Sequence, residues 1–200
     1  MSSQEELRTI ALREFARSGY GSTSLHRIAE IAGLSKSSVL YHYSSKEALL
    51  EAAIAPAIDA MDSIISAMEG LEFTQERRHA FIVRFVDFLL AHRSEVHMFI
   101  NQARSLEDVP AVGRANEVVG RIAEVFGAAV NSTEDRMRFG MALGGAAYSL
   151  VTQDEFGQTE SPIDETRAAL VTIMTELLAP VSVSPALTVS PALTVSPVLN

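Results

Sequence analysis

Short polar side chains and two lysines gather between Thr23 and Lys46, in the segment TSLHRIAEIAGLSKSSVLYHYSSK. Hydroxyl groups such as those of Ser37 and Ser38 give or accept hydrogen bonds to base edges and to phosphates. Ammonium groups such as that of Lys36 neutralise phosphate charge and release counterions. The chemistry available in this segment is therefore that of contact with DNA.

Two short helices joined by a tight turn are predicted to position these groups. Apolar residues recur at helical spacing in the first helix, and Thr23 or Ser24 can cap its free amides. Gly33 interrupts this pattern, Leu34 is expected to face inward, and Ser35 can cap the second helix. A helix that enters the ~12 Å wide major groove needs short or planar side chains on its outer face, and the second helix offers them. The same spacing also fits an ordinary helical corner whose polar residues are merely solvated.

From Leu7 to Leu50 the chain resembles the amino-terminal domain of the TetR family of transcriptional regulators. The matching segments are FARSGYGSTS at residues 15–24, IAEIAGLS at residues 28–35 and YHY-x-SKEALL at residues 41–50. The resemblance implies a three-helix DNA-binding domain followed by a larger helical domain for ligand binding and dimerisation. It also implies repression of transcription that a small molecule relieves.

The resemblance assigns DNA contacts to individual positions. These positions are Ser24, His26, Lys36, Ser37, Ser38, Tyr41, His42 and Lys46. By the resemblance, the three residues at 36–38 meet bases and the others meet backbone phosphate. Leu40 stands where many family members have Tyr, and Ser37 stands where Gly is common. At these two positions the chain is expected to differ from its relatives.

Charge is divided unevenly along the 200 residues, whose net charge is -9. Residues 1–50 hold six Lys and Arg against five Asp and Glu, a net of +1. Residues 51–200 hold ten against twenty, a net of -10. An acidic body repels DNA everywhere except at the amino-terminal face, which favours one docking orientation. Acidic surfaces are also common in soluble proteins, so this charge pattern fits a protein without DNA-binding activity just as well.

Composition excludes several other classes of protein. A hydrophobic content of 48% supports a sizeable core, and the apolar stretches are too short for a membrane span or a secretory signal. The absence of cysteine excludes disulfides and thiolate sites, and it is compatible with the cytoplasm. His92 and His97 are five residues apart and point to different helix faces, so no metal site is expected. With no catalytic constellation and no phosphate-binding loop, the chain is expected to be no enzyme and to need no cofactor.

The fold class is predicted to be all α, because no alternating apolar pattern long enough for a sheet is present. A first helix is expected to start at Ser2 or Ser3. Ser44 or Ser45 is expected to open a long fourth helix, where Glu47 can complete a capping box with Ser44. Pro56 predicts a kink or a short break in that helix near residues 52–56. Further helices are predicted at about residues 74–91, 95–104 and 109–130, after Ser132, and from the Ser-Pro pair at residues 161–162.

Three regions are expected along the chain. A helix-turn-helix DNA-binding domain occupies residues 1–50, with the motif at about residues 24–43, and a helical regulatory and dimerisation domain occupies residues 51–180. The tail at residues 181–200 contains VSPALTVSPALTVSPVLN, a period-six repeat whose prolines forbid a continuous helix. Disorder is expected there, with a docking peptide as the alternative.

Dimerisation is expected because one helix-turn-helix covers too few bases to specify a genomic site. Small residues near positions 140–147 would let a partner helix approach closely, and the resemblance puts the dimer bundle in the last two helices. The predicted interface residues are Gly140, Gly144, Ala147, Leu170, Ile173 and Leu177. Packing within one chain could use the same glycines.

A ligand chamber is predicted among the aromatic and methionine side chains of the second region. Its candidate residues are Phe85, Phe88, Met98, Phe99, Gln102, Phe126, Met141 and Tyr148. The alternative for each of them is ordinary core packing. With no basic cluster in this region, the expected effector is neutral or cationic and mostly apolar.

The leading interpretation is a homodimeric, sequence-specific DNA-binding regulator of transcription. It would act as a repressor that a small-molecule effector releases from a palindromic double-stranded DNA operator. One alternative is a helical small-molecule-binding protein or enzyme with a vestigial DNA-binding domain. Another is a protein-interaction module that docks through the repeat tail. These patterns encode neither the operator sequence nor the identity of the effector.

Overall fold

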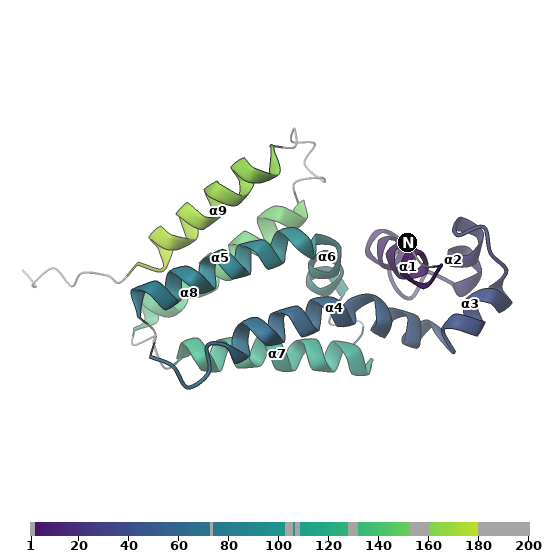
Figure 1. Ribbon diagram of the computed structural model, residues 1–200, viewed down its shortest axis with the longest axis horizontal. Helices are drawn as coiled ribbons and strands as arrows, with labels where there is room; N and C mark the ends of the chain where they lie inside the picture. The colour runs from purple at the N-terminus through teal and green to yellow at the C-terminus, as the bar shows by residue number, and fades with distance from the viewer. Residues whose placement is uncertain are drawn as a thin grey trace, which may run out of the picture.

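The computed structural model describes residues 3–72, 74–102, 106, 109–127, 132–152 and 161–179. Regular secondary structure in these ranges is helical, with no strand, which confirms the all-α class (Figure 1). The helices are α1 (Ser3–Ser18), α2 (Leu25–Ile31), α3 (Lys36–His42), α4 (Lys46–Ser66), α5 (Gln75–Ala91), α6 (Arg93–Gln102), α7 (Pro110–Gly127), α8 (Thr133–Thr152) and α9 (Ile163–Leu177). The tail at residues 181–200, for which the sequence predicts disorder, lies outside the described residues.

The helices α1, α2 and α3 form a small group at one end of the molecule, here named the head (Figure 1). Its centre is built from Leu7, Phe15, Ile28 and Val39, which pack with Leu49 at the start of α4, and all five are completely buried. The helices α2 and α3 have only seven residues each, so burial against the other helices stabilises them more than intrinsic propensity does.

The long helix α4 leaves the head and enters the remainder of the chain, here named the body. It continues from Lys46 to Ser66 with Pro56 inside it, so the short break considered from the sequence does not occur. Pro56 is exposed, whereas Ala53, Ile54 and Ala57 beside it are buried. Burial of the inner face on both sides of the proline offsets the lost amide hydrogen bond, and the helix therefore persists.

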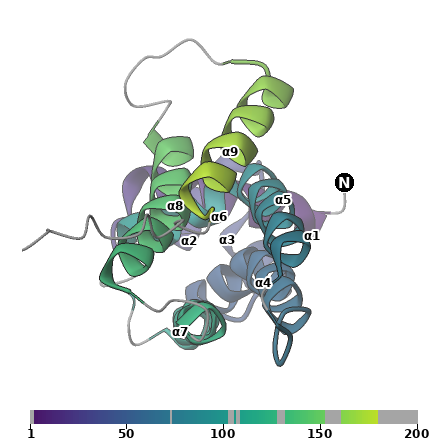
Figure 2. The ribbon, with the colours of Figure 1, turned by 90° about the vertical axis from the view of Figure 1, so that its left-hand side faces the viewer.

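The helices α5 to α9 complete the body around α4 (Figure 2). The helix α7 packs against α4, α9 packs against α5 and α8, and α6 packs against α8 and back against α1. Polar caps begin two of these helices: the Thr74 hydroxyl accepts a hydrogen bond from the Arg77 amide, and the Ser132 hydroxyl accepts one from the Asp135 amide. The last helix starts after Pro162 without a side-chain cap.

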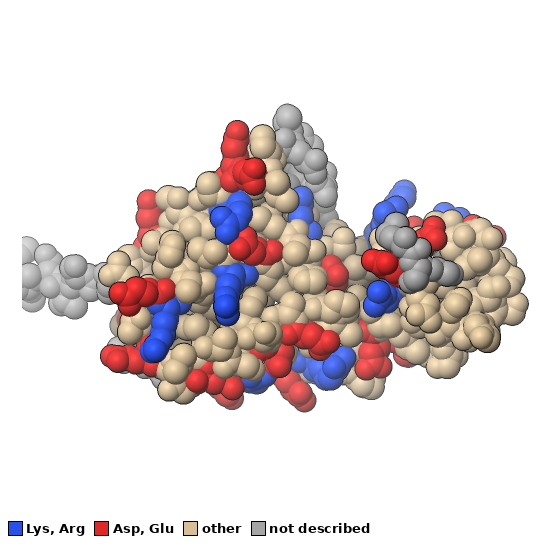
Figure 3. Space-filling model, in the orientation of Figure 1, with Lys and Arg blue, Asp and Glu red and all other residues tan. Residues whose placement is uncertain are grey.

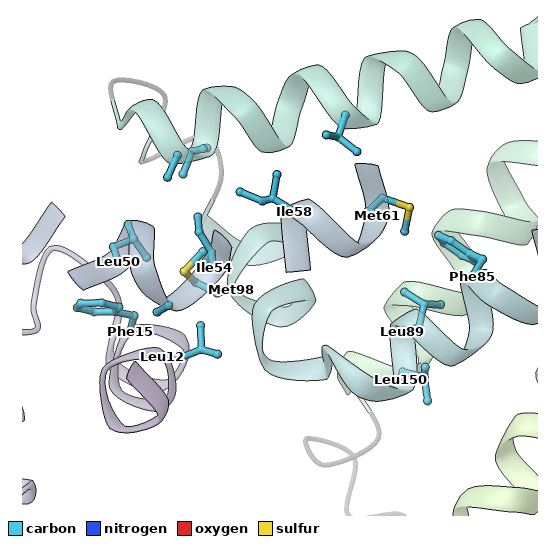
Figure 4. Close-up of a cluster of buried hydrophobic side chains, with 14 of the residues drawn as sticks. Leu12, Phe15, Leu50, Ile54, Ile58, Met61, Phe85, Leu89, Met98 and Leu150 are labelled. Atoms are coloured by element: carbon cyan, nitrogen blue, oxygen red, sulfur yellow. The ribbon is translucent and has the colours of Figure 1, made fainter. Parts of the chain in front are cut away.

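One hydrophobic core runs through both parts of the molecule. Leu12 and Phe15 of the head pack with Ile54 of α4 and Met98 of α6, and the cluster continues to Leu150 of α8 (Figure 4). The head is therefore joined to the body by shared packing as well as by the chain. No helix in the described ranges is long and apolar enough to cross a bilayer.

Candidate DNA-binding face and ligand cavity

Hydrogen-bonded caps and a glycine turn set the geometry of the predicted helix-turn-helix. The Ser24 hydroxyl accepts from the Arg27 amide at 3.1 Å, and the Ser35 hydroxyl accepts from the Ser38 amide at 3.1 Å. Between the two helices Gly33 has a φ of 65°, a left-handed conformation that residues with a Cβ rarely adopt. Local sequence signals thus decide where α2 ends and where α3 begins.

The outer side of α3 brings several of the predicted DNA-contacting residues together. A shallow depression on the head is lined by Leu34, Ser37, Ser38, Tyr41 and His42. The Tyr41 side chain is 86% exposed, and Leu34 is 36% exposed. The expectation that Leu34 faces inward is therefore wrong, because the turn at Gly33 carries it to the outer edge of α3.

The serine hydroxyls of this depression are linked to each other. The Ser35 Oγ lies 2.8 Å from the Ser37 Oγ and 2.8 Å from the Ser38 Oγ. Ser37 is exposed, whereas Ser38 is half-buried. A hydroxyl group can donate one hydrogen bond and accept others, so Ser37 keeps capacity for an external partner.

The residues predicted at the start of α2 are also exposed. His26 Nε2 lies 3.3 Å from Glu30 Oε1 on the same helix. Beside it Arg27, which was not among the predicted contacts, pairs with Glu14 at 3.6 Å and with Glu30 at 3.7 Å while its side chain stays 60% exposed. Arg27 lies within the motif, so its exposed charge makes it a further candidate for phosphate contact, which the charge of the residue could have indicated from the sequence.

Lys46 has internal partners in addition to its predicted role. Its ammonium group donates to the carbonyl oxygens of Tyr20 at 2.9 Å and of Thr23 at 3.1 Å. The same group lies 4.1 Å from the centre of the Tyr20 ring. Lys46 therefore fastens the turn between α1 and α2 to the start of α4, a role that the sequence analysis did not foresee.

The predicted capping box of Ser44 and Glu47 is wrong. The N-cap of α4 is Ser45, whose hydroxyl accepts from the Ala48 amide at 3.1 Å. Glu47 instead accepts a hydrogen bond from the Tyr20 hydroxyl at 2.9 Å. Its own backbone amide, the Ser45 side chain and the Tyr20 hydroxyl hold the pKa of Glu47 below its ordinary value, while burial and Glu47 raise the pKa of Tyr20.

The body contains an apolar cavity of about 460 Å³ between α4, α5, α6, α7 and α8. Five of the eight predicted ligand residues line it, namely Phe85, Phe88, Met98, Phe99 and Tyr148. Most of the remaining wall comes from aliphatic residues of α4 and α7. The aromatic positions alone did not point to those residues, because α4 and α7 read as ordinary amphipathic helices.

The other three predicted ligand residues do not line the cavity. Gln102 turns away from it toward the end of α1, where it forms two hydrogen bonds. Phe126 is buried among other rings, with its centre 4.5 Å from that of Phe81 and 4.3 Å from that of Phe139. Met141 is 57% exposed on the outer side of α8. The residue types suggested candidates for a ligand chamber, but helical spacing alone could not show toward which neighbour each side chain points.

The predicted dimer residues divide into two groups. Gly140, Gly144 and Ile173 are exposed, whereas Ala147, Leu170 and Leu177 pack partly against the core of their own chain. Gly144 and Ala147 also belong to the cavity wall. Packing within the chain therefore accounts for part of this set, and the exposed part remains a predicted interface.

Acidic side chains are spread over the body, with larger groups along the edge formed by α4 and α7 (Figure 3). Arg121 of α7 pairs with Asp62 of α4 and with Glu69 in the turn after α4, which ties the two helices together. Within the described ranges no cluster of three or more potential metal ligands occurs.

The head matches a known protein family in sequence. Residues 8–53 match the family model for bacterial regulatory proteins of the tetR family. The HTH-type transcriptional regulator RutR of Escherichia coli strain K12 is 45% identical to the chain over 49 residues, and the same holds for RutR of Shigella flexneri. This match spans 24% of the chain and 23% of RutR.

Solved structures resemble the chain over its greater part. Mycobacterium smegmatis AmtR matches with a TM-score of 0.70 and 21% identity, over 89% of this chain and 86% of AmtR. A TetR-family transcriptional regulator from Bordetella parapertussis matches with a TM-score of 0.62 and 16% identity, over 86% of this chain and 93% of its own. At these identities the likeness shows the fold alone.

RutR and the Bordetella parapertussis protein are both named as transcriptional regulators. The match to the head reaches the positions that carry the helix-turn-helix, and the structural likeness extends through the body. Residues 8–53 of the chain are thus similar in sequence to bacterial regulatory proteins of the tetR family, and the likeness to solved structures over the greater part of the chain shows a shared fold.

Proposed function

We propose that the protein is a homodimeric repressor that binds operator DNA through its head and leaves the operator when a small molecule fills the cavity of the body. The observation that carries the DNA-binding part is the patch on α3 formed by the exposed Ser37 and Tyr41 and the half-buried His42, beside the exposed Lys36. Hydroxyl, ring and ammonium groups on one helix face suit base edges and phosphates. The proposed division between head and body lies at about residue 50, and the cytoplasm is the proposed site of action.

The DNA-binding part is tested by selecting genomic fragments that bind the purified protein and measuring the affinity of the selected duplex. Tyr41→Ala is expected to weaken binding about tenfold, or ~1.4 kcal/mol, because the exposed ring would reach backbone phosphate. Lys36→Gln is expected to reduce the slope of log affinity against log salt by about one. Leu71→Ala, at an exposed position of the body outside α8 and α9, is the control and should leave both quantities unchanged. Unchanged affinity in Tyr41→Ala and unchanged slope in Lys36→Gln would rule out this face.

The homodimer is supported by apolar side chains that α8 and α9 leave exposed. Met137 and Met141 on α8 and Ile163 and Ile173 on α9 are all more than half exposed. Exposed apolar residues on two neighbouring helices are typical of a subunit interface. Two copies related by a two-fold axis would present two heads to one face of a palindromic operator.

Sedimentation equilibrium tests the dimer. Met141→Glu combined with Ile173→Glu is expected to shift the protein toward the monomer, because two like charges would be buried against the partner copy. Leu71→Glu, at another exposed apolar position outside α8 and α9, is the matched control and should leave the dimer intact. A dimer that survives the double change would place the interface elsewhere.

The release by an effector is supported by the position of α6. Val96, Met98 and Phe99 of this helix form part of the cavity wall, and Gln102 at its end reaches the head. The Tyr20 amide donates to the Gln102 Oε1 at 2.7 Å, and the Gln102 Nε2 donates to the Phe15 carbonyl oxygen. A ligand that displaces α6 would therefore pull on the end of α1.

Gln102→Leu tests this link, since leucine keeps similar bulk and removes both hydrogen bonds. Faster hydrogen exchange of the Tyr20 amide is expected, together with a several-fold change in operator affinity of the ligand-free protein. The matched control is Asn101→Leu, at the exposed neighbouring position. If Gln102→Leu leaves operator affinity unchanged, the connection from cavity to head runs by another path.

A further inference from the structure

The wall of the cavity is apolar to an unusual degree. It draws on five helices, and nearly all of the surface that faces the empty space belongs to carbon atoms. Ile54, Ile58 and Met61 of α4 face it with Phe85 and Leu89 of α5 (Figure 4). Its volume of about 460 Å³ lies in the range of small-molecule sites.

Among the described residues that line the cavity, only Glu95 and Tyr148 carry a polar side-chain group, and none is Lys, Arg or His. Glu95 Oε1 already lies 3.4 Å from His92 Nδ1, and the Glu95 side chain is only 18% exposed. A buried anion would meet no positive charge here, and a buried cation would meet one carboxylate that has a partner already. Either charge would lose its hydration without compensation.

The polar part of a ligand has a place only at the edge of the cavity. Ile100, Val119 and Tyr148 belong to the lining and are 38%, 49% and 55% exposed, so they mark the side that is open to solvent. The Tyr148 hydroxyl can exchange a hydrogen bond with a hydroxyl or carbonyl oxygen held there. The hydrocarbon part of the same molecule would extend inward toward Phe85 and Met61.

We infer that this cavity takes an uncharged, hydrocarbon-rich molecule whose only polar group stays at the mouth. The inference rests on the proposed function, since it names the chemical class of the effector. It selects against fatty acids and against quaternary amines of the same chain length. The selection comes from the cost of charge in the wall and not from the shape of the cavity.

The test is a competition assay on the full chain without DNA. N-phenylnaphthylamine, an uncharged dye that brightens in apolar surroundings, reports occupancy. Dodecanol competes with it below the solubility limit of the alcohol, and dodecanoate and dodecyltrimethylammonium compete below their micelle concentrations. Dodecanol is expected to bind at least tenfold more tightly than either charged competitor. In a series of shorter alcohols, each added methylene should tighten binding up to about fourfold until the cavity is full.

Two variants tie the binding to this cavity. Ala115 of α7 lies in the wall and the neighbouring Asn116 is exposed, so Ala115→Phe should weaken dodecanol binding at least tenfold whereas Asn116→Phe should not. If Ala115→Phe does not fold, Gly144→Leu replaces it, because a Cβ on Gly144 would meet no atom within 4 Å.

A charged competitor that binds as tightly as dodecanol, or dodecanol binding that survives both wall variants, would overturn the inference. Failure of all three competitors and of the dye would overturn it as well. Operator release is measured separately with the selected duplex. Dodecanol that binds without releasing DNA would leave the inference standing and contradict the proposed effector response.

Discussion

The head and the body position their candidate functional residues by different means. In the head, the depression on α3 is lined by residues between positions 34 and 42. The hydrogen bonds that cap α2 and α3 each join a serine hydroxyl to a backbone amide only three residues later. In the body, the cavity wall extends from Ile54 to Tyr148 along the chain. Short-range signals therefore suffice to place a recognition helix, whereas a cavity depends on how distant helices pack.

The boundary between the head and the body is held by hydrogen bonds to one residue, Tyr20. Tyr20 of the head donates its amide to Gln102 of α6 and its hydroxyl to Glu47 of α4. Lys46 holds the carbonyl of the same residue. Three segments that are far apart in sequence thus meet at one turn, and this turn is where a change in the body would reach the head.

The largest expected effect comes from the shared core. Phe15 is completely buried at the end of α1, and Phe15→Ala should lower the free energy of unfolding by about 3–5 kcal/mol. Because the core is continuous, urea should still unfold the head and the body in one transition, followed by hydrogen exchange at amides of both. A body that keeps its midpoint while the head melts alone would contradict a shared core.

The next effect tests the internal role of Lys46. Lys46→Ala removes two charge-assisted hydrogen bonds and the contact with the Tyr20 ring, and it should cost about 1.5–3 kcal/mol in urea unfolding. Lys36→Ala is the matched control, because Lys36 is exposed and should change stability by less than about 0.5 kcal/mol. Equal costs for the two variants would show that Lys46 does not fasten the turn.

Replacement by alanine should change the stability in opposite directions at two glycines. Gly33 has a φ of 65°, so Gly33→Ala should destabilise the head by about 1 kcal/mol. Gly120 is exposed within α7, where an added Cβ meets no atom within 4 Å, so Gly120→Ala should stabilise the body by about 0.5–1 kcal/mol. Thermal unfolding of both variants measures the difference, and shifts of the same sign would mean that the turn at Gly33 is not specified locally.

The smallest expected effect is the pH dependence at the junction. The pKa of Glu47 is lowered in the fold, so its contribution is complete above the unfolded value near 4.5 and is lost as the pH falls through the folded pKa. Glu47→Gln should therefore lose less stability than the unchanged chain between neutral pH and acid. Urea midpoints across this range measure it, and parallel curves would exclude Glu47 as the responsible group.

The sequence was informative wherever a local pattern carries the physical cause. Ser24, Gly33 and Ser35 predicted the helix-turn-helix, and the structure has each in its expected place. The prediction of a capping box at Ser44 was wrong because Ser45, one residue later, caps the helix equally well. In addition, the Glu47 carboxylate accepts a hydrogen bond from the Tyr20 hydroxyl instead of bonding to a backbone amide of the cap. Either of two adjacent serines can serve as an N-cap, and only the tertiary contacts of the residues beside them decide which one does.

The sequence alone determined the helical class of the chain, the position of the motif and the uneven division of charge, because periodicity, caps and charge are properties of neighbouring residues. Only the tertiary structure decided that Gln102 serves the junction, that Phe126 belongs to the aromatic core and that Met141 faces outward. It also decided that α4 and α7 close an almost wholly apolar cavity. Each of these depends on the rotation of one helix against another, and packing of the whole chain sets that rotation.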